Sequence, residues 1–162
     1  MRVNHSHQFP VIYFADASKF NSVNLIDILS DDEILRSDSF KREIDSSLYI
    51  ISRALLRKLL GSYLEIAPQQ IVISYSSKGK PYLKDCPHIK FNISHSHGAV
   101  AIAIALNDEI GLDIEPQNRK FEYQKLKSFL YSESELHMGE ESFLKVWTIK
   151  EAIVKARGMG LS

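Results

Sequence analysis

Three short apolar segments with very little chain between them constrain the fold of this sequence more than any other feature. Residues 89–93 (IKFNI) and 99–106 (AVAIAIAL) are rich in apolar side chains, and Asn107 and Asp108 separate the second segment from residues 109–114. Apolar runs of this length, bounded by turn residues, are typical of β-strands. Because connections this short leave no room for a crossover helix, the sequence predicts antiparallel hairpins or a meander.

Helical patterns lie on both sides of these segments. The longest covers residues 45–60, where apolar residues recur every three or four positions, and Gly61 is expected to end it. Gly158 and Gly160 are expected to end the last helix. Two shorter helices are expected at residues 121–130 and 142–156, and two further strands are expected at residues 11–15 and 71–75. This order of elements predicts an α+β fold.

The composition excludes several classes of protein. The 162 residues carry 20 basic and 20 acidic side chains, which argues against a general nucleic-acid binder with its usual basic excess. Cys86 is the single cysteine, so an internal disulfide and a multi-cysteine zinc site are excluded. Residues 1–8 lack the features of a secretory signal, and the longest apolar run is too short to span a bilayer. We therefore expect a soluble, cytoplasmic protein.

Two carboxylates form the first candidate site, in the segment GLDIE at residues 111–115. In a strand, Asp113 and Glu115 would face the same side, where their charges repel each other unless a cation lies between them. Carboxylate oxygens are ligands by which proteins hold Mg²⁺. The alternative is a solvated strand end in front of Pro116, because exposed acidic residues are common.

The apolar helical pattern around Trp147 contains a second candidate site. Trp147, Glu151 and Lys155 are spaced four residues apart and share one face of the helix. A charge that is buried by such a helix must be paired or bound to a metal. An ordinary Glu–Lys pair on an exposed helix face is the alternative.

A third candidate site follows the first apolar strand, in the segment FNISHS at residues 91–96. Its small hydroxyl groups, its amide and its histidine suit the binding of oxyanions. His95 and His97 also have the alternate spacing of zinc ligands. For His97, as for His5 and His7 near the N-terminus, we expect an exposed surface position instead.

Two further signals each have an ordinary structural explanation. The turn at Gly79, Lys80 and Pro81 would bring an ammonium group and backbone to a phosphate, although Gly and Pro are also common turn residues. Glu135 follows Ser132 by three residues, which is the spacing of a helix capping box.

Five of these segments follow one another in a characteristic order: GKP at 79–81, FNISHS at 91–96, GLDIE at 111–115, SESE at 132–135 and WTIKEAIVKARGMGLS at 147–162. This set resembles the 4′-phosphopantetheinyl transferases of the surfactin-synthetase type. The resemblance extends loosely back through residues 40–60. It implies two similar α+β halves related by a pseudo-twofold axis, here residues 1–106 and 107–162, with coenzyme A bound between them.

The resemblance also implies a reaction. Enzymes of this family move the phosphopantetheine arm of coenzyme A onto a serine hydroxyl of an acyl or peptidyl carrier protein and release adenosine 3′,5′-bisphosphate. Residues matching Asp113, Glu115 and Glu151 hold Mg²⁺ on the pyrophosphate, with Mn²⁺ as an alternative ion. Glu135 matches a glutamate that would deprotonate the attacking serine, and Glu151 acting through a water is the other candidate base.

Four positions acquire roles in binding coenzyme A by the same resemblance. His95 matches a histidine beside the 3′-phosphate, and Ser94 lies next to it in the matching loop. Lys80 and Lys155 match lysines that contact phosphates. Lys155 would in addition offset negative charge during the transfer.

The carrier protein is expected to dock on residues 118–131. This segment combines basic side chains with an apolar stripe, and carrier proteins are typically acidic around the modified serine. A basic rim around an apolar stripe suits an acidic, amphipathic helix. An ordinary helix that faces the core with a solvated basic side is the alternative.

Two features depart from the family pattern. Family members usually continue for several strands after the GxGLS segment, whereas this chain stops at Ser162, so its second half is expected to be incomplete. In addition, a basic residue expected early in the long helix falls at Leu48. Arg53 or Arg57 would then have to compensate at the 3′-phosphate.

Two other functions are alternatives to the transferase. The first is an inactive, truncated module that still binds coenzyme A or a carrier protein. The second is a zinc hydrolase built on His95, His97, Asp113 and Glu115. The hydrolase would leave the charged residues of the last helix without a role.

Overall fold

A computed structural model describes residues 9–135 and 137–159 of the chain. Gly160 and the end of the WTIKEAIVKARGMGLS segment lie outside the described residues, as do His5 and His7. None of the helices in these ranges combines the length and the hydrophobicity that are needed to span a bilayer.

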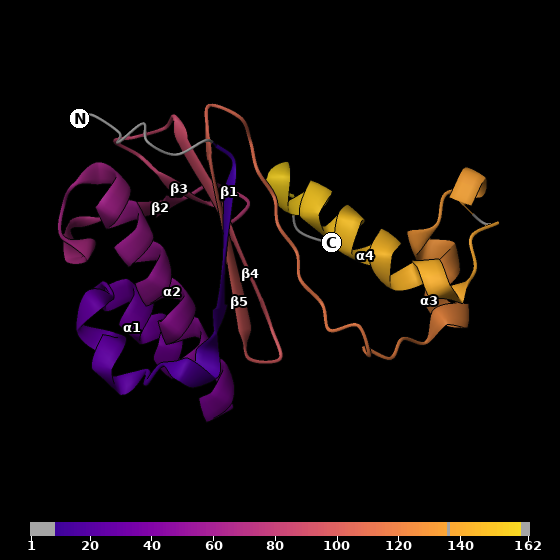
Figure 1. The fold of residues 1–162 in the computed structure, drawn as a ribbon, viewed down its shortest axis with the longest axis horizontal. Helices are drawn as coiled ribbons and strands as arrows, with labels where there is room; N and C mark the ends of the chain where they lie inside the picture. Colours follow the sequence, from indigo (N-terminus) through magenta and orange to yellow (C-terminus); the bar gives the residue numbers. More distant parts are fainter. Residues whose placement is uncertain (1–8, 136, 160–162) are drawn as a thin grey trace.

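Antiparallel strands form the centre of the N-terminal part (Figure 1). Three strands make one sheet in the order β1-β5-β4, and two short strands make a separate ribbon. Their bounds are β1 Val11–Asp16, β2 Ile73–Tyr75, β3 Pro81–Leu83, β4 Ile89–Ser96 and β5 Ala99–Leu106. A tight turn at His97 and Gly98, with φ of 49° and 82°, joins β4 to β5. The predicted antiparallel pairing of the first two apolar segments is confirmed.

The predicted third strand at residues 109–114 is wrong. After β5 the chain turns at Asn107, and residues 109–115 then run alongside β4 without strand pairing. Side chains of β4 bind this segment: the Leu112 N–H donates to Asn92 Oδ1 (2.9 Å) and the Ile114 N–H donates to Ser94 Oγ (3.3 Å). Because these side chains replace the backbone ladder, the segment is extended but does not enlarge the sheet.

The main core lies between the three-stranded sheet and α2 (Glu43–Leu64), which crosses one face of it (Figure 1). Leu56 and Leu60 of α2 are completely buried there. The shorter helices packed around this core are η1 Ala17–Lys19, η2 Val23–Ile28, α1 Asp31–Asp38 and η3 Pro68–Gln70.

The long helix does not end at Gly61 as predicted. It continues to Leu64 and ends where Glu65 takes a left-handed conformation (φ 55°). A Cβ atom at Gly61 would lie 2.8 Å from the carbonyl oxygen of Ile66. The glycine therefore lets the returning chain pass close to the helix, and it does not terminate the helix.

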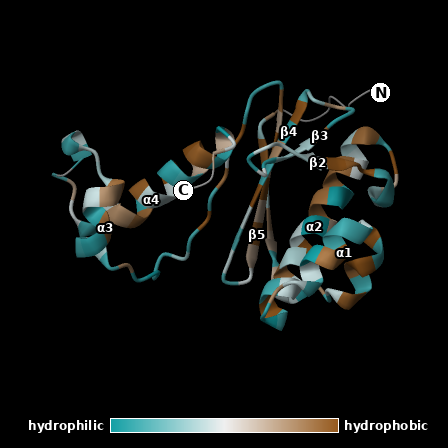
Figure 2. Ribbon diagram, turned by 180° about the vertical axis from the view of Figure 1, so that it is seen from behind, coloured by the Kyte–Doolittle hydropathy of each residue, from teal (hydrophilic) through white to brown (hydrophobic). Residues whose placement is uncertain are grey.

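The C-terminal part consists of α3 (Tyr123–Leu130), η4 (Glu133–Glu135) and α4 (Glu140–Ala156). It has a small hydrophobic cluster of its own, made by Leu130, Tyr131, Phe143 and Val146. Figure 2 shows β5 as hydrophobic along its length, whereas hydrophobic and hydrophilic turns alternate along α4. The mixture of helices with antiparallel strands agrees with the expected α+β fold.

The C-terminal end of α4 returns to the sheet beside residues 109–115. The contact is so close that a Cβ atom at Gly111 would lie 1.9 Å from the carbonyl oxygen of Ala152. Only a glycine allows this approach. The contact brings the last two turns of α4 next to the GLDIE segment.

Candidate active site

Strand β4 separates two groups of polar side chains. β4 is an edge strand, and successive residues of a strand face opposite sides. Ser94 contacts Asp113 and Lys155, whereas His95 lines a cavity that also borders α2. The FNISHS segment thus contributes to both groups.

On the first side, Lys155 of α4 forms an ion pair with Asp113. The distance between Lys155 Nζ and Asp113 Oδ1 is 2.6 Å, and Ser94 Oγ donates to the same oxygen at 3.0 Å. The side chain of Asp113 is only 7% exposed. Its other oxygen, Oδ2, is buried and has no hydrogen-bond partner among the described residues. A buried carboxylate oxygen without a donor is costly, and a bound cation would satisfy it.

Glu151 lies near this pair, one helical turn before Lys155. Burial and the neighbouring Asp113 carboxylate raise the pKa of Glu151 above its ordinary value, while Lys155 and Arg119 act in the opposite direction. Two neighbouring carboxylates are a common arrangement for a divalent cation.

Glu115 lies on the same side of the GLDIE segment as Asp113, as predicted. Ser96 Oγ donates to Glu115 Oε2 at 3.3 Å, two residues along β4 from the serine that contacts Asp113. Glu115 is also ion-paired with Arg119, whose guanidinium lies over the ring of Phe121, 4.7 Å from its centroid. The Glu115 carboxylate is thus already paired with the Arg119 side chain.

The donor set therefore fits a divalent metal in its chemistry. Asp113 offers a free, buried oxygen, and Glu151 adds a second carboxylate. In the described part of the chain, however, no three acidic, histidine or cysteine side chains lie close enough together to hold an ion. His97 does not join His95 in such a group, because it is exposed and contacts Ser96 Oγ through Nδ1 at 3.0 Å.

Glu135 is engaged in structural contacts. Its Oε2 atom accepts hydrogen bonds from the Ser132 N–H (2.8 Å), from Ser132 Oγ (2.7 Å) and from Lys150 Nζ (2.5 Å). The bond from Lys150 and the two from Ser132 lower the pKa of Glu135 to about 2. The capping role anticipated from the sequence accounts for the two contacts with Ser132, and the contact with Lys150 is a separate ion pair to α4.

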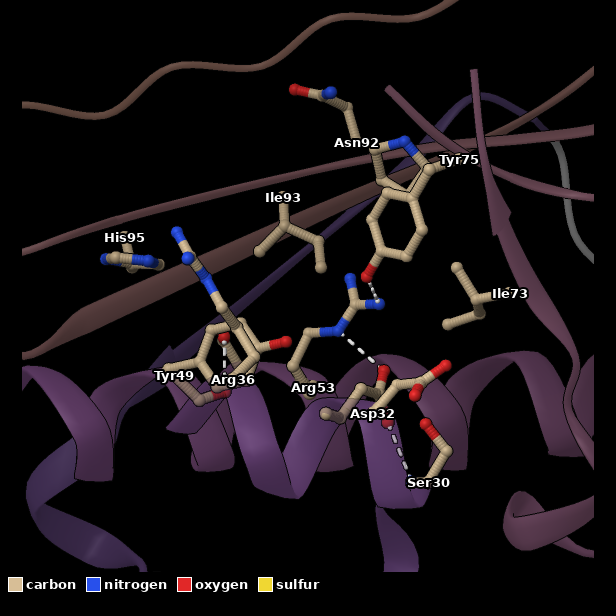
Figure 3. A pocket seen from close by; sticks show the side chains of 13 residues that line it. Ser30, Asp32, Arg36, Tyr49, Arg53, Ile73, Tyr75, Asn92, Ile93 and His95 are labelled. Atoms are coloured by element: carbon tan, nitrogen blue, oxygen red, sulfur yellow. Dashed lines mark hydrogen bonds and ion pairs between the residues drawn. The ribbon is translucent and has the colours of Figure 1, made fainter. Parts of the chain in front are cut away.

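On the other side of β4 lies a cavity of about 440 Å³ (Figure 3). Its lining comes from α1, α2, β2, β3 and β4: Ser30, Asp32, Glu33, Arg36, Tyr49, Ser52, Arg53, Ile73, Tyr75, Pro81, Asn92, Ile93 and His95. This volume is in the range of small-molecule sites.

A buried network makes the floor of this cavity rigid. Arg53 donates to Glu33 Oε1 (2.7 Å) and to Tyr75 Oη (2.7 Å), and Arg57 donates to Glu33 Oε2 (2.6 Å). Burial by itself would raise the pKa of Glu33, but Arg53, the Ser30 N–H and Arg57 bring it below its ordinary value. Of the two arginines expected to compensate for Leu48, Arg53 lines the cavity, whereas Arg57 points to backbone carbonyls below it.

His95 lies at the rim of the cavity and is exposed to solvent. Partial desolvation and the Lys155 ammonium lower its pKa, while Asp45 has the opposite effect. Tyr49 lies in the same lining, and burial raises its pKa to about 12. Tyr49, Tyr75 and Arg36 were missed by the sequence analysis, because none of them lies in a motif and five elements are needed to bring them together.

Lys80 does not line this cavity. Its ammonium group contacts Glu109 Oε2 (2.5 Å) and the carbonyl oxygen of Ala156 (2.6 Å), at the C-terminal end of α4. Its neighbour in the turn, Pro81, does line the cavity.

Two family models match the chain, one to each part. The model described as 4′-phosphopantetheinyl transferase, N-terminal, matches residues 16–107, and that of the 4′-phosphopantetheinyl transferase superfamily matches residues 109–162. The chain belongs to the 4′-phosphopantetheinyl transferase family. The cavity, Lys155 and the GLDIE carboxylates are thus features of a phosphopantetheinyl transferase chain.

Curated relatives of this chain come from bacteria, from a fission yeast and from rodents. The 4′-phosphopantetheinyl transferase HetI of Nostoc is 33% identical over 83% of this chain and 61% of its own length. The L-aminoadipate-semialdehyde dehydrogenase-phosphopantetheinyl transferase of Schizosaccharomyces pombe is 31% identical over 83% of this chain and 60% of its own. The 4′-phosphopantetheinyl transferase ffp of Bacillus subtilis is 29% identical over 85% and 64%. The chain thus spans about three fifths of the length of these relatives.

Proposed function

We propose that this chain transfers the phosphopantetheine arm of coenzyme A to a serine hydroxyl of an acyl or peptidyl carrier protein in the cytoplasm. The observation that carries this proposal is the Lys155–Asp113 pair, with its unpartnered buried oxygen, across β4 from a cavity of about 440 Å³. The Lys155 ammonium can then bind a phosphate and the Asp113 carboxylate can bind a cation, next to a cavity large enough for a nucleotide. The five motifs support the surfactin-synthetase type, with two similar halves that meet near Asn107.

The cavity would take the nucleotide end of coenzyme A. Tyr49 and Tyr75 present aromatic rings that can pack against a nucleobase. Arg36 and His95 place cationic and hydrogen-bonding groups at the mouth, where the 3′-phosphate would be held. A phosphate at His95 would raise the pKa of this imidazole and so favour its charged form.

The pyrophosphate would pass around the edge of β4. Ser94 and His95 are consecutive residues of this edge strand, so a ligand that leaves the cavity at His95 reaches Lys155 on the other face. Asp113 and Glu151 would hold Mg²⁺ or Mn²⁺ there, with Glu115 joining them when it exchanges Arg119 for the ion. When bound, the metal would neutralise charge on the pyrophosphate.

In the proposed reaction the serine oxygen bonds to the phosphorus on the pantetheine side. The bond from that phosphorus to the bridging oxygen breaks, and adenosine 3′,5′-bisphosphate leaves with the electron pair. The serine proton passes through a water to a carboxylate, which we assign to Glu151. Glu135 is less suitable because its Oε2 already accepts from Ser132 and Lys150. Lys155 would stabilise the charge that builds up on the transferred phosphate.

The carrier protein would dock beside α3. Phe129 is 69% exposed there, and Lys125 lies on the exposed side of the helix. Part of the predicted docking stripe faces inward instead, since Leu126 and Leu130 belong to the small hydrophobic cluster. The proposed surface is therefore narrower than the stripe that the sequence suggested.

Intact-protein mass spectrometry tests this function directly. An apo carrier protein is incubated with this chain, coenzyme A and Mg²⁺, and we expect it to gain the mass of one phosphopantetheine group, with the gain abolished by EDTA. Asp113→Asn should lower the initial rate by about 10³-fold, because it removes a carboxylate that would hold the cation needed to neutralise the pyrophosphate. Asp108→Asn is the matched control, since Asp108 is an exposed acidic residue five positions earlier.

A normal rate in Asp113→Asn would contradict the metal assignment. A chain that is stabilised by coenzyme A but transfers nothing would identify the binding module as the correct alternative. Hydrolytic activity that needs zinc, is indifferent to coenzyme A and is lost in His97→Ala would identify the hydrolase.

A further inference from the structure

Lys80 makes a polar contact between two elements that lie far apart in the chain. It comes from the turn between β2 and β3, yet its ammonium group reaches the last turn of α4, 76 residues along the chain. Nζ lies 2.6 Å from the carbonyl oxygen of Ala156 and 2.5 Å from Glu109 Oε2. The side chain is only 16% exposed, so it is packed rather than loosely attached to the surface.

The chain on both sides holds Lys80 in this position. The Lys80 N–H donates to Ser76 Oγ (3.0 Å), and its carbonyl accepts from the Ser76 N–H (2.9 Å). At the other end, Gly158 has φ of 62°, and a Cβ atom there would lie 3.3 Å from Lys80 Cδ. The helix end therefore folds back over the aliphatic part of the lysine.

The Lys80 ammonium supplies a hydrogen-bond donor to a carbonyl group at the C-terminal end of α4. The last carbonyl groups of an α-helix have no partner within the helix, and their partial negative charge favours a cation. Glu109 holds the ammonium in place and is itself held by Lys90 Nζ at 2.8 Å. The result is a polar clamp between the β2–β3 ribbon, Glu109 just before the GLDIE segment, and α4.

We infer that Lys80 is a positioning residue that fixes the C-terminal end of α4, and with it Lys155 and Glu151, against Asp113. Ala156 is adjacent to Lys155, so a shift of the helix end moves the Lys155 ammonium away from Asp113 and Ser94. This role rests on the proposed transferase function for its effect on rate. It differs from direct contact with a coenzyme A phosphate, the role that the sequence suggested for Lys80.

The experiment compares five proteins: the unmodified chain, Lys80→Met, Lys80→Arg, Glu109→Gln and the control Lys84→Met. Methionine keeps the aliphatic contact with Gly158 but removes the charge, and Lys84 is an exposed lysine directly after β3. Hydrogen exchange of the amides of residues 155–159 is measured without ligand, and kcat and the KM for coenzyme A are measured in the transfer assay.

For Lys80→Met we expect these amides to exchange about fivefold faster, the size of a lost helix-end cation. We expect kcat to fall about tenfold through misalignment of Lys155, with the KM for coenzyme A within about twofold of normal. Lys80→Arg should have the normal exchange rate and the normal kcat, and Lys84→Met should change neither of these two quantities. Glu109→Gln, which keeps the lysine but loosens it, should shift the exchange in the same direction by a smaller factor.

Unchanged exchange in Lys80→Met, together with a raised KM for coenzyme A, would overturn the inference and favour a direct phosphate contact. If the unmodified chain transfers nothing, the proposed function fails. The exchange comparison then still decides whether Lys80 clamps α4, because it needs no activity.

Discussion

The two parts of this molecule are held together in different ways. The N-terminal part packs α2 on a three-stranded sheet around one large apolar core. The C-terminal part has only a small cluster around Phe143, and polar contacts attach α4 to the rest of the molecule: Lys155 to Asp113 and Lys80 to Ala156. A further polar contact, Asn92 to Leu112, holds the GLDIE segment at the same junction. The proposed catalytic residues lie at this polar junction, whereas the proposed nucleotide cavity lies in the well-packed part.

This difference has a consequence for function. A large apolar core gives a binding cavity of fixed shape, because well-packed interiors resist deformation. Polar contacts at a junction contribute less free energy but have defined directions, so they set the relative position of Lys155 and Asp113. Changes in the core should therefore affect stability first, and changes at the junction should affect alignment first.

The largest effect should come from Glu33→Gln in the floor of the cavity. The change leaves two buried arginines without a counter-charge, so we expect a loss of about 4 kcal/mol in the free energy of unfolding. Urea denaturation followed by circular dichroism measures it, with the exposed Glu43→Gln as control. An equal midpoint for both variants would show that the network does not stabilise the N-terminal part.

The same carboxylate gives a pH dependence. The pKa of Glu33 is lowered in the folded protein, so its stabilising contribution is present above the ordinary carboxyl pKa and is lost as the pH falls through the lowered value. The unmodified chain should therefore lose stability in acid more steeply than Glu33→Gln.

Phe143→Ala tests whether the two parts unfold separately. Phe143 is 1% exposed at the centre of the small cluster, and its truncation should cost about 3 kcal/mol locally. We expect the amides of α3 and α4 to exchange faster, while those of β5 keep their protection. An equal loss of protection in β5 would mean that the two parts form one cooperative unit.

A smaller effect is expected from Asn92→Ala at the junction. The change removes the acceptor for the Leu112 N–H and should cost about 1 to 2 kcal/mol. The Leu112 amide should exchange faster than in Asn118→Ala, a control within the exposed stretch that follows the GLDIE segment. An unchanged Leu112 amide would show that other contacts fix this segment.

The smallest effect is expected from His95. Desolvation and Lys155 lower its pKa in the folded protein, so the unfolded chain binds the proton more readily. Stability should therefore decrease slightly as the pH falls from about 6.5, and His95→Gln should flatten this slope. Thermal melting of the unmodified chain and of His95→Gln, at pH values from about 7.5 to about 5.5, measures this difference in slope. A steeper decline in the variant would contradict the direction of the shift.

Local patterns in the sequence predicted much of this structure correctly. The β4–β5 hairpin, the capping role of Glu135 and the placement of Asp113 and Glu115 on one side all depend on residues close together in the chain. The family resemblance rests on the same kind of information, because its motifs are short and have regular spacing. The errors, at Gly61 and in the 109–114 segment, concern residues whose conformation depends on distant neighbours.

The sequence by itself determined most of the elements, the polar residue types of the candidate site and the family. Only the tertiary structure decided that Arg36, Tyr49 and Tyr75 share a cavity with His95, and that Lys80 binds the end of α4 and lies outside this cavity. The physical reason is that periodicity and turn chemistry act over a few residues. A cavity or a helix clamp is instead made by side chains that are far apart in the chain and meet only when the core packs.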